Sequence, residues 1–157
     1  MSNQLVIYTD GAARGNPGRG GYGVVMLFGD KKKELSAGYR LTTNNRMELM
    51  AVVVALQALK VKNVPLIIYT DSQYIVNSVT KRWLDGWLKT NFKGGKKNKD
   101  LWLQYAALAK DFLITFQWVK GHASNVYNNR CDVLATTAAD GGNLLADEVY
   151  EEEVKMK

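Results

Sequence analysis

Two matching stretches of sequence decide the fold: Leu5-Val6-Ile7-Tyr8-Thr9-Asp10 and Leu66-Ile67-Ile68-Tyr69-Thr70-Asp71. Each is a short apolar run rich in β-formers, which is typical of a buried strand, and each ends on an aspartate followed by a small residue. Parallel strands joined through a helix place their carboxyl ends at one edge of a sheet, where open α/β proteins bind ligands. If these strands are neighbours, Asp10 and Asp71 lie close together. Each aspartate could instead cap a turn, but the repeated sequence favours a shared site.

The rest of the chain alternates between apolar patterns and turns. Further strands are expected over 22–28 and 34–42, after a glycine-rich loop over 11–21, and over 113–119. Helices are expected over 46–59 with Asn44 or Asn45 as N-cap, from Ser72 onward, around 81–88, from Asp100 as cap to about 112, and over 128–139. A meander followed by strand–helix alternation predicts an α/β domain with a mixed sheet.

Length and composition exclude several classes of protein. The 157 residues suit one domain, and 46% hydrophobic with 23% charged residues is typical of a packed chain rather than a disordered one. No apolar run approaches the roughly 20 residues that span a bilayer and no signal-peptide pattern is present, so we expect a cytoplasmic protein with no membrane partner. Cys131 is the only cysteine and His122 the only histidine. Any bound metal must therefore be held by carboxylates.

The charge is unevenly distributed. The chain carries a net charge of +6, yet its last eleven residues hold five acidic and two basic side chains. The remaining 146 residues are therefore strongly basic, with 19 basic and 10 acidic side chains, which suggests a polyanionic partner. The alternative is that the lysines only maintain solubility. We expect one domain over 1–142 and an acidic tail over 143–157 that stays outside the core.

Two further carboxylates occupy helix starts. Glu48 lies in an otherwise apolar helix, where an unpaired charge would be costly to bury, although Asn45 and Glu48 also have capping-box spacing. Asp132 is expected in the opening turn of the last helix, where the helix dipole alone could favour it. With Asp10 and Asp71, four carboxylates would converge on one edge of the sheet.

Such a cluster suits phosphate chemistry. Mg²⁺ prefers oxygen ligands, and two ions roughly 3.5–4 Å apart can support cleavage of a phosphodiester. His122 lies in a loop ten residues before Asp132, where an imidazole could relay protons near neutral pH, although a lone loop histidine is often only a surface residue.

Five groups of residues occur in order between about residues 5 and 140: Asp10-Gly11 with Gly15-Asn16-Pro17-Gly18 and Gly20-Gly21-Tyr22-Gly23; Thr42-Thr43-Asn44-Asn45-Arg46-Met47-Glu48-Leu49; Thr70-Asp71-Ser72-Gln73-Tyr74; Trp118-Val119-Lys120-Gly121-His122; and Arg130-Cys131-Asp132. Together they resemble type 1 ribonuclease H, most closely bacterial ribonuclease HI. The resemblance implies a ribonuclease H-like fold, with a five-stranded mixed sheet of order 3-2-1-4-5 flanked by helices. It also implies endonucleolytic, two-metal-ion hydrolysis of the RNA strand of RNA–DNA hybrids, leaving 5′-phosphate and 3′-hydroxyl ends.

The resemblance also implies roles for individual residues. Two Mg²⁺ ions, with Mn²⁺ as a substitute, would be held in the substrate complex by Asp10, Glu48, Asp71 and Asp132. His122 would help in proton transfer or product release. The residues that match hybrid-binding positions fall into two sets: minor-groove contacts at Asn16, Asn44, Asn45 and Gln73, and phosphate contacts at Thr43 and Asn98.

A basic segment over residues 81–99 interleaves seven cationic side chains with aromatic ones, against one acid, Asp85. Cations bind phosphates by releasing counterions, and aromatic rings can pack on sugars or brace the loop. In the family this segment grips the DNA strand, so we expect a monomer with no separate hybrid-binding domain. The candidate contacts are Trp83, Trp87, Lys89, Lys93, Lys96 and Lys97. The alternative is a solvated helix whose tryptophans belong to the core.

The chain departs from the family pattern after His122, where Ser124 replaces a glycine and Asn129 replaces a glutamate. The second change removes negative charge near the second metal, which leaves the metal preference open. Ala12 and Ala13 also differ, with little expected effect.

Two other functions compete with the nuclease: a catalytically silent module that binds hybrid or double-stranded RNA, and another nuclease of the same superfold, such as a transposase or junction resolvase. The silent binding module would need the basic segment but not the four carboxylates. Another nuclease of the superfold would lack the paired asparagines and the glutamine that read a strand with 2′-hydroxyl groups.

Overall fold

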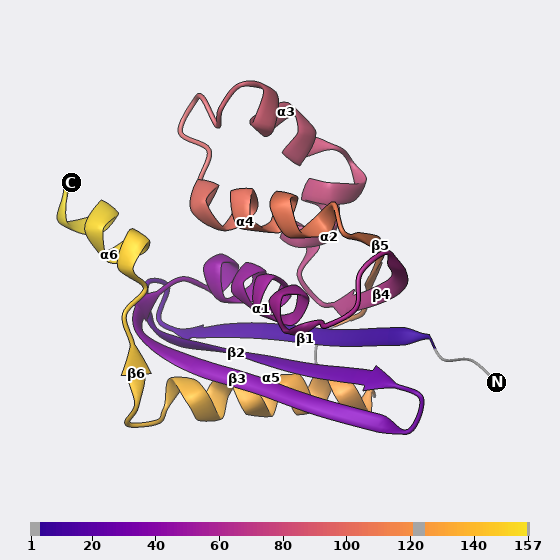
Figure 1. Cartoon of the computed structure of the whole chain (residues 1–157). Helices are drawn as coiled ribbons and strands as arrows, with labels where there is room; N and C mark the ends of the chain where they lie inside the picture. The colour runs from indigo at the N-terminus through magenta and orange to yellow at the C-terminus, as the bar shows by residue number, and fades with distance from the viewer. Residues whose placement is uncertain (1–3, 121–124, 157) are drawn as a thin grey trace.

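The computed structural model describes residues 4–120 and 125–156, and its centre is a mixed sheet with helices on both faces (Figure 1). The strand order is β5-β4-β1-β2-β3-β6, with β1–β3 antiparallel and β1, β4 and β5 parallel. The strands are β1 Leu5–Arg14, β2 Gly18–Phe28, β3 Lys31–Thr42, β4 Val64–Thr70, β5 Phe112–Trp118 and β6 Leu144–Leu145. The predicted five-strand order is confirmed, and the short β6 extends it.

The helices form two layers (Figure 1). α1 lies on one face of the sheet with α4 packed against it, and α5 lies on the other face. Their bounds are α1 Asn44–Ala58, α2 Gln73–Thr80, α3 Trp83–Lys89, α4 Lys99–Ala109, α5 Val126–Ala139 and α6 Glu148–Lys155. No helix in the described part of the chain is long and apolar enough to cross a membrane.

The glycine-rich stretch over 11–21 is mostly strand rather than the predicted loop, because β1 continues to Arg14 and β2 begins at Gly18. The glycines of β2 and β3 serve packing instead. A Cβ at Gly21 would collide with the carbonyl oxygen of Ala135, one at Gly23 with that of Cys131, and one at Gly38 with that of Ala138. α5 therefore rests directly on the backbone of two strands, which side chains there would prevent.

The helix caps differ from those predicted. Thr43, not Asn44 or Asn45, caps α1, and its hydroxyl accepts a hydrogen bond from the Arg46 N–H at 3.2 Å. Glu48 is thus beyond the first three helical residues, so the capping-box explanation of this residue is wrong.

The other two boundaries also shift. Asn98 caps α4 in a left-handed conformation, and the predicted cap, Asp100, lies in the first turn. α5 begins two residues early, after the cap Asn125, so Asp132 lies in its second turn rather than its first.

The start of the acidic tail belongs to the fold, so the expectation that residues 143–157 stay outside the core is wrong for this part. Leu144 and Leu145 pair with β3 at Gly38 and Tyr39. Asp147 is only 3% exposed and accepts a hydrogen bond from the Thr42 hydroxyl at 2.7 Å. The Asp147 carboxylate can be buried here because it pairs with a buried cationic side chain.

That partner is Arg46, which is 1% exposed and joins α1, α4 and α6. It donates to both carboxylate oxygens of Asp147 at 2.7 and 2.8 Å and to both of Asp100 at 2.8 and 2.9 Å. Burial acts to lower the pKa of Arg46, but the two carboxylates outweigh it and hold the pKa above its usual value. Bidentate pairing of this kind compensates a buried charge.

Candidate metal site and nucleic-acid surface

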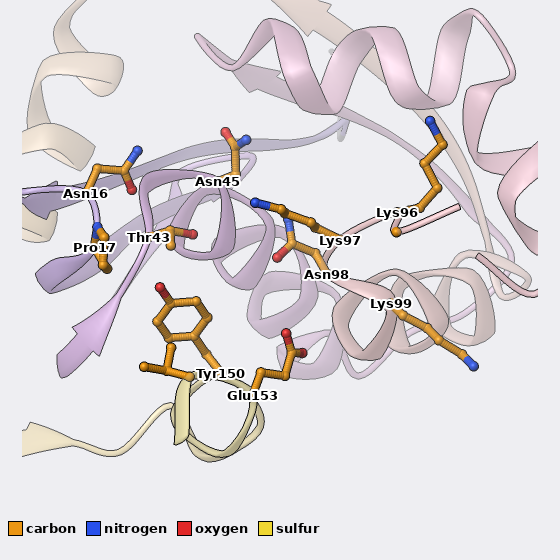
Figure 2. Close-up of a pocket in the computed structure, with 12 residues that line it drawn as sticks. Asn16, Pro17, Thr43, Asn45, Lys96, Lys97, Asn98, Lys99, Tyr150 and Glu153 are labelled. Carbon is orange, nitrogen blue, oxygen red and sulfur yellow. The ribbon is translucent and has the colours of Figure 1, made fainter. Parts of the chain in front are cut away.

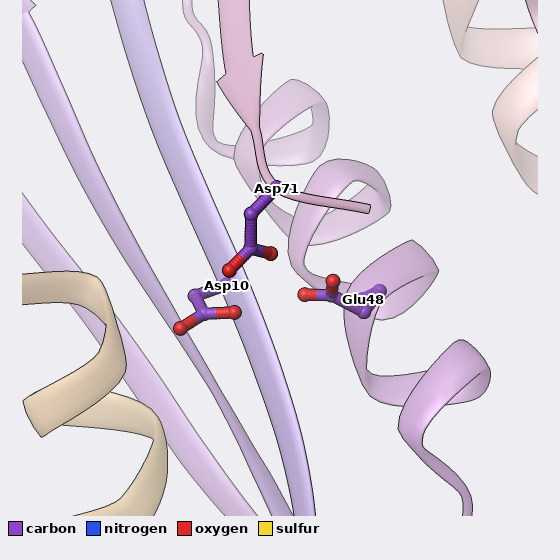
Figure 3. A group of neighbouring side chains, drawn as sticks. All are labelled: Asp10, Glu48 and Asp71. Carbon is purple, nitrogen blue, oxygen red and sulfur yellow. The ribbon is translucent and has the colours of Figure 1, made fainter. Parts of the chain in front are cut away.

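The predicted convergence of Asp10 and Asp71 occurs, although β1 continues beyond Asp10. β1 and β4 are parallel neighbours with Thr9 opposite Thr70, so Asp10 and Asp71 follow at the same edge of the sheet. Glu48 reaches the same point from α1, and one carboxylate oxygen from each of the three residues lies within 4.8 Å of the others. Figure 3 shows the three side chains pointing toward one another from two strands and a helix.

Gly11 brings the helix close enough for this contact. A Cβ at this position would collide with the backbone nitrogen of Glu48 and the carbonyl carbon of Met47. The helix therefore lies directly on β1, one residue after Asp10. Because the approach is backbone to backbone, it defines where the Glu48 side chain starts.

Burial and mutual repulsion disfavour the charged forms of this cluster. Burial first, and the neighbouring charge of Asp71 second, raise the pKa of Asp10 to about 8, although a hydrogen bond with Glu48 acts in the opposite direction. Burial, followed by the charges of Asp10 and Asp71, also raises the pKa of Glu48. Without a cation, the cluster keeps protons that ordinary carboxyl groups lose.

The donor set fits a divalent cation of the hard type. It consists only of carboxylate oxygens, which Mg²⁺ and Mn²⁺ accept as ligands. One of these atoms, Oε1 of Glu48, is buried and finds no hydrogen-bond partner among the described residues. Buried polar atoms usually have a partner, and a bound cation would supply one.

Asp132 reaches the same cavity but is not one of the three clustered residues. It projects from α5, and its charge is among the causes that raise the pKa of Asp10. The cavity has a volume of about 390 Å³. Three predicted minor-groove residues line it as well, and the full lining is Asp10, Gly11, Ala12, Asn44, Asn45, Glu48, Asp71, Ser72, Gln73, Tyr74 and Asp132.

Two residues singled out in the sequence, His122 and Ser124, lie outside the described residues. Asn129 lies exposed on α5, the helix that also supplies Asp132.

Figure 2 shows a second cavity, with a volume of about 500 Å³. Asn45 lines both cavities, so the two adjoin each other. The second cavity brings together predicted hybrid-binding residues from three segments: the β1–β2 turn, the start of α1 and the basic segment. The lining is Asn16, Pro17, Thr43, Asn45, Gly95, Lys96, Lys97, Asn98, Lys99, Tyr150, Glu153 and Val154.

Hydrogen bonds tie these segments together. The Asn16 side-chain oxygen accepts from the Asn44 N–H at 3.1 Å, and the Asn44 side-chain oxygen accepts from the Ala13 N–H at 2.7 Å. The Asn98 amide donates to the Tyr74 hydroxyl at 3.1 Å. The turn is therefore tied to the start of α1, and the loop end is tied to α2.

The basic segment divides its tryptophans between two roles. Trp83 is 45% exposed, with the Lys81 ammonium 5.5 Å from its ring centre. Trp87 is partly buried against the core, with its ring centre 6.1 Å from that of Trp102. The Lys96 ammonium lies 6.0 Å from the centre of the Trp87 ring, so the ring supports the position of this lysine in the cationic loop. Lys89 and Lys93 are exposed, as a phosphate contact requires.

The sequence does not predict the roles of four residues: Gly11, Tyr150 and Glu153, which line these cavities, and Arg46, which anchors α6. Gly11 and Arg46 enter the prediction only as members of motifs. A lone arginine inside an apolar helix was a usable signal of a buried ion pair. The sequence predicts Tyr150 and Glu153 in a tail outside the core. No local pattern places them at a cavity whose other lining residues lie between positions 16 and 99, apart from Val154.

Comparisons with known proteins agree with this geometry. A family model described as RNase H matches residues 2–140. The ribonuclease H of Lachnoclostridium phytofermentans is 52% identical to this chain over 158 residues, covering 94% of this chain and 99% of that protein. Two crystal structures are also similar. LC9-RNase H1, a type 1 RNase H with the type 2 active-site motif, has a TM-score of 0.80 at 29% identity, covering 98% of this chain and 82% of that one. LC11-RNase H1, solved in complex with RNA/DNA hybrid, has a TM-score of 0.67 at 27% identity, covering 87% and 97%.

Proposed function

Because this chain belongs to the ribonuclease H family, we propose that it hydrolyses the RNA strand of RNA–DNA hybrids at the cavity lined by Asp10, Glu48 and Asp71. The products are 5′-phosphate and 3′-hydroxyl ends. One observation supports this proposal most: three carboxylates meet where the parallel pairing of β1 and β4 ends, and an oxygen of Glu48 has no partner among the described residues.

The residues that would hold the metal are Asp10, Glu48 and Asp71, with Asp132 as the fourth ligand. Two Mg²⁺ ions, for which Mn²⁺ can substitute, supply activation of the attacking water and stabilisation of the leaving oxygen. The chain's own side chains orient the substrate: Asn44, Asn45 and Gln73 line the same cavity, where they can read the minor groove of the hybrid.

A direct assay tests the proposal. The protein is incubated with end-labelled RNA–DNA hybrid, RNA duplex and DNA duplex, each with Mg²⁺ and with a chelator. Cleavage of the RNA strand of the hybrid alone, and only with Mg²⁺, is the expected result. Binding without metal-dependent cleavage would instead identify a silent binding module. Cleavage of DNA duplex would identify another nuclease of the same superfold.

His122 is proposed to assist proton transfer or product release without contacting the metals. Replacing His122 by alanine should lower turnover by roughly 10²-fold, because general acid–base groups contribute in that range, and should leave substrate affinity nearly unchanged. Steady-state kinetics with the hybrid measure both. A variant that loses only affinity would show that this role is wrong.

The basic segment is proposed to bind phosphates remote from the metals. Changing Lys89, Lys93, Lys96 and Lys97 to glutamine should raise KM and weaken its salt dependence, because each lost phosphate contact lowers the log–log salt slope by about 0.9. Up to about 3–4 units of slope should disappear. Single-turnover cleavage at saturating hybrid should stay near the parent rate.

The control for this variant is Lys31, Lys32 and Lys33 changed to glutamine, with the change in slope compared per lysine because three charges are removed instead of four. These lysines are equally exposed but lie at the start of β3, far from α3 in Figure 1. If both variants change the slope alike, net charge explains the effect and the basic segment has no special role. Trp83 is proposed as an exposed contact of the same surface, whereas Trp87 acts by supporting Lys96.

We further infer that the protein works in the cytoplasm as a monomer. The single cysteine, buried in the structure, is consistent with a reducing compartment. Light scattering after size-exclusion chromatography measures the mass directly, and a dimer mass would contradict the monomer.

A further inference from the structure

The C-terminal helix forms one wall of the second cavity. Tyr150, Glu153 and Val154 of α6 line it opposite Thr43 and the lysines of the basic segment. Figure 2 shows the Tyr150 hydroxyl and the Glu153 carboxylate directed into the cavity from the α6 side. A tyrosine and a glutamate therefore face a space whose remaining polar side chains are lysines, asparagines and one threonine.

This wall is firmly attached to the domain. Asp147, which precedes α6, holds the buried Arg46 at 2.7 Å, and the Arg46 guanidinium lies 5.9 Å from the centre of the Tyr150 ring. One turn later, Glu151 accepts hydrogen bonds from Arg40 at 2.8–3.2 Å. The contacts keep Tyr150 and Glu153 at the cavity in the free protein.

The chemistry of the cavity suits a phosphate group. The Lys97 ammonium points into the cavity in Figure 2, whereas the Lys96 and Lys99 side chains line it with their ammonium groups directed outward. Thr43 and Asn98 can donate hydrogen bonds to an anion there. Asn45 borders both this cavity and the carboxylate cavity, so a backbone that passes the metals can continue into this space. A volume of about 500 Å³ accommodates a phosphate with parts of its sugars.

We propose that α6 completes a binding site for one backbone phosphate of the hybrid, in which the Tyr150 hydroxyl donates a hydrogen bond to the phosphate and the Glu153 carboxylate limits the affinity. This inference rests on the proposed function, since the occupant is the substrate of the same enzyme. The two α6 side chains act in opposite directions: a hydroxyl donor stabilises an anion, and a carboxylate beside it repels the anion.

Two variants separate these contributions. Tyr150→Phe removes only the hydroxyl and keeps the ring over Arg46, so the fold should be unaffected. We expect hybrid binding to weaken about 10- to 100-fold, as a lost hydrogen bond to a charged group predicts. Glu153→Gln removes the repulsion and should tighten binding about 2- to 4-fold at low salt, with the gain fading as salt screens it.

Each variant has a matched control. Tyr69→Phe removes a hydroxyl from β4, where Tyr69 stacks on Tyr8 at 4.8 Å. Glu152→Gln removes the same charge from α6 at an exposed position, where Glu152 lies 3.9 Å from the Lys155 ammonium. Dissociation constants are measured by fluorescence anisotropy in chelator, with kcat and KM in Mg²⁺ and melting temperatures alongside. Both controls should bind like the parent, and kcat should stay unchanged in all four proteins.

The decisive probe is the substrate itself. A series of hybrids carries one neutral methylphosphonate linkage each, at successive positions. At the linkage that occupies the cavity, the effects of Tyr150→Phe and Glu153→Gln should both vanish, because the charge they sense is gone. Variants that match their controls, or effects that persist with every hybrid of the series, would overturn the inference. A lowered melting temperature with unchanged affinity would show that Tyr150 is only structural. Parent protein that fails to cleave hybrid would contradict the proposed function itself, which the direct assay reports separately.

Discussion

Replacing Asp10 by asparagine is expected to abolish cleavage of the hybrid and to raise the stability of the metal-free protein. The residue clusters with Glu48 and Asp71, so its loss removes one ligand from the proposed metal site. Metal ions contribute several kcal/mol of transition-state stabilisation, which corresponds to a loss of roughly 10³-fold or more in rate. Hybrid binding should survive, because the phosphate contacts lie elsewhere.

The stability gain follows from the raised pKa of Asp10, about 8 against an ordinary value near 4. A raised pKa means that the folded protein retains a proton that the unfolded chain releases. The stability contributed by the protonated carboxyl is full below about pH 4 and is lost as the pH rises through about 8. Parent protein in chelator should therefore melt at progressively lower temperature across this window, and the asparagine variant should show a flatter profile.

Thermal unfolding followed by circular dichroism at pH 5, 7 and 9 measures this effect. At pH 9 the variant should gain about 1–2 kcal/mol, or roughly 2–8 °C, over the parent. Mg²⁺ should raise the melting temperature of the parent more than that of the variant. Asp30→Asn, the same change in an exposed turn, is the control and should alter neither activity nor stability. Substantial Mg²⁺-dependent cleavage by Asp10→Asn would exclude Asp10 as a ligand.

Replacing Arg46 by alanine should destabilise the fold by about 3–5 kcal/mol, since removing one partner of a buried ion pair leaves the other charge buried without a partner. Asp147, at 3% exposure, would be left without its cation, and α6 would lose its attachment to α1. The second replacement, Asp147→Asn, should cost much less in the Arg46→Ala background than in the parent, because the stranded charge is then absent.

Urea unfolding of the four proteins of this cycle measures the coupling. Arg40→Ala is the control: Arg40 also pairs with a glutamate of α6 but is largely exposed, so about 0–1 kcal/mol is expected. Additive effects of Arg46→Ala and Asp147→Asn would show that the two side chains do not stabilise each other.

Local sequence patterns were sufficient for the centre of the fold. The apolar runs that end at Asp10 and Asp71 carry their own strand signal, and the rule for parallel strands places both aspartates at one edge of the sheet. That the two strands are neighbours is implied only by the strand order of the family. Helix boundaries were less accessible, because a side chain can cap a helix only if the backbone before it is extended, and Thr43, Asn44 and Asn45 compete for that position. The tertiary structure decides among them by pairing Thr42 with β2.

Features that depend on distant partners could not be predicted. Asp147 resembles its acidic neighbours in the sequence, and only the position of Arg46, a hundred residues earlier, makes it a buried residue. The same limit applies to the second cavity. Its predicted residues came from family motifs, whereas Tyr150 and Glu153 reach it because β6 directs the chain back across the sheet.

The contact of α5 with bare backbone at Gly21, Gly23 and Gly38 affects how sequence variants of this protein should be interpreted. A mutational scan scored by activity alone would rank these glycines beside the carboxylates, although they take no part in the reaction. Any side chain there lifts α5, and Asp132 moves with the helix. A scan that also scores protein abundance would separate the two groups: carboxylate variants stay abundant, whereas glycine variants do not. Among natural sequence variants, intolerance at these positions indicates the spacing between helix α5 and the sheet rather than chemistry.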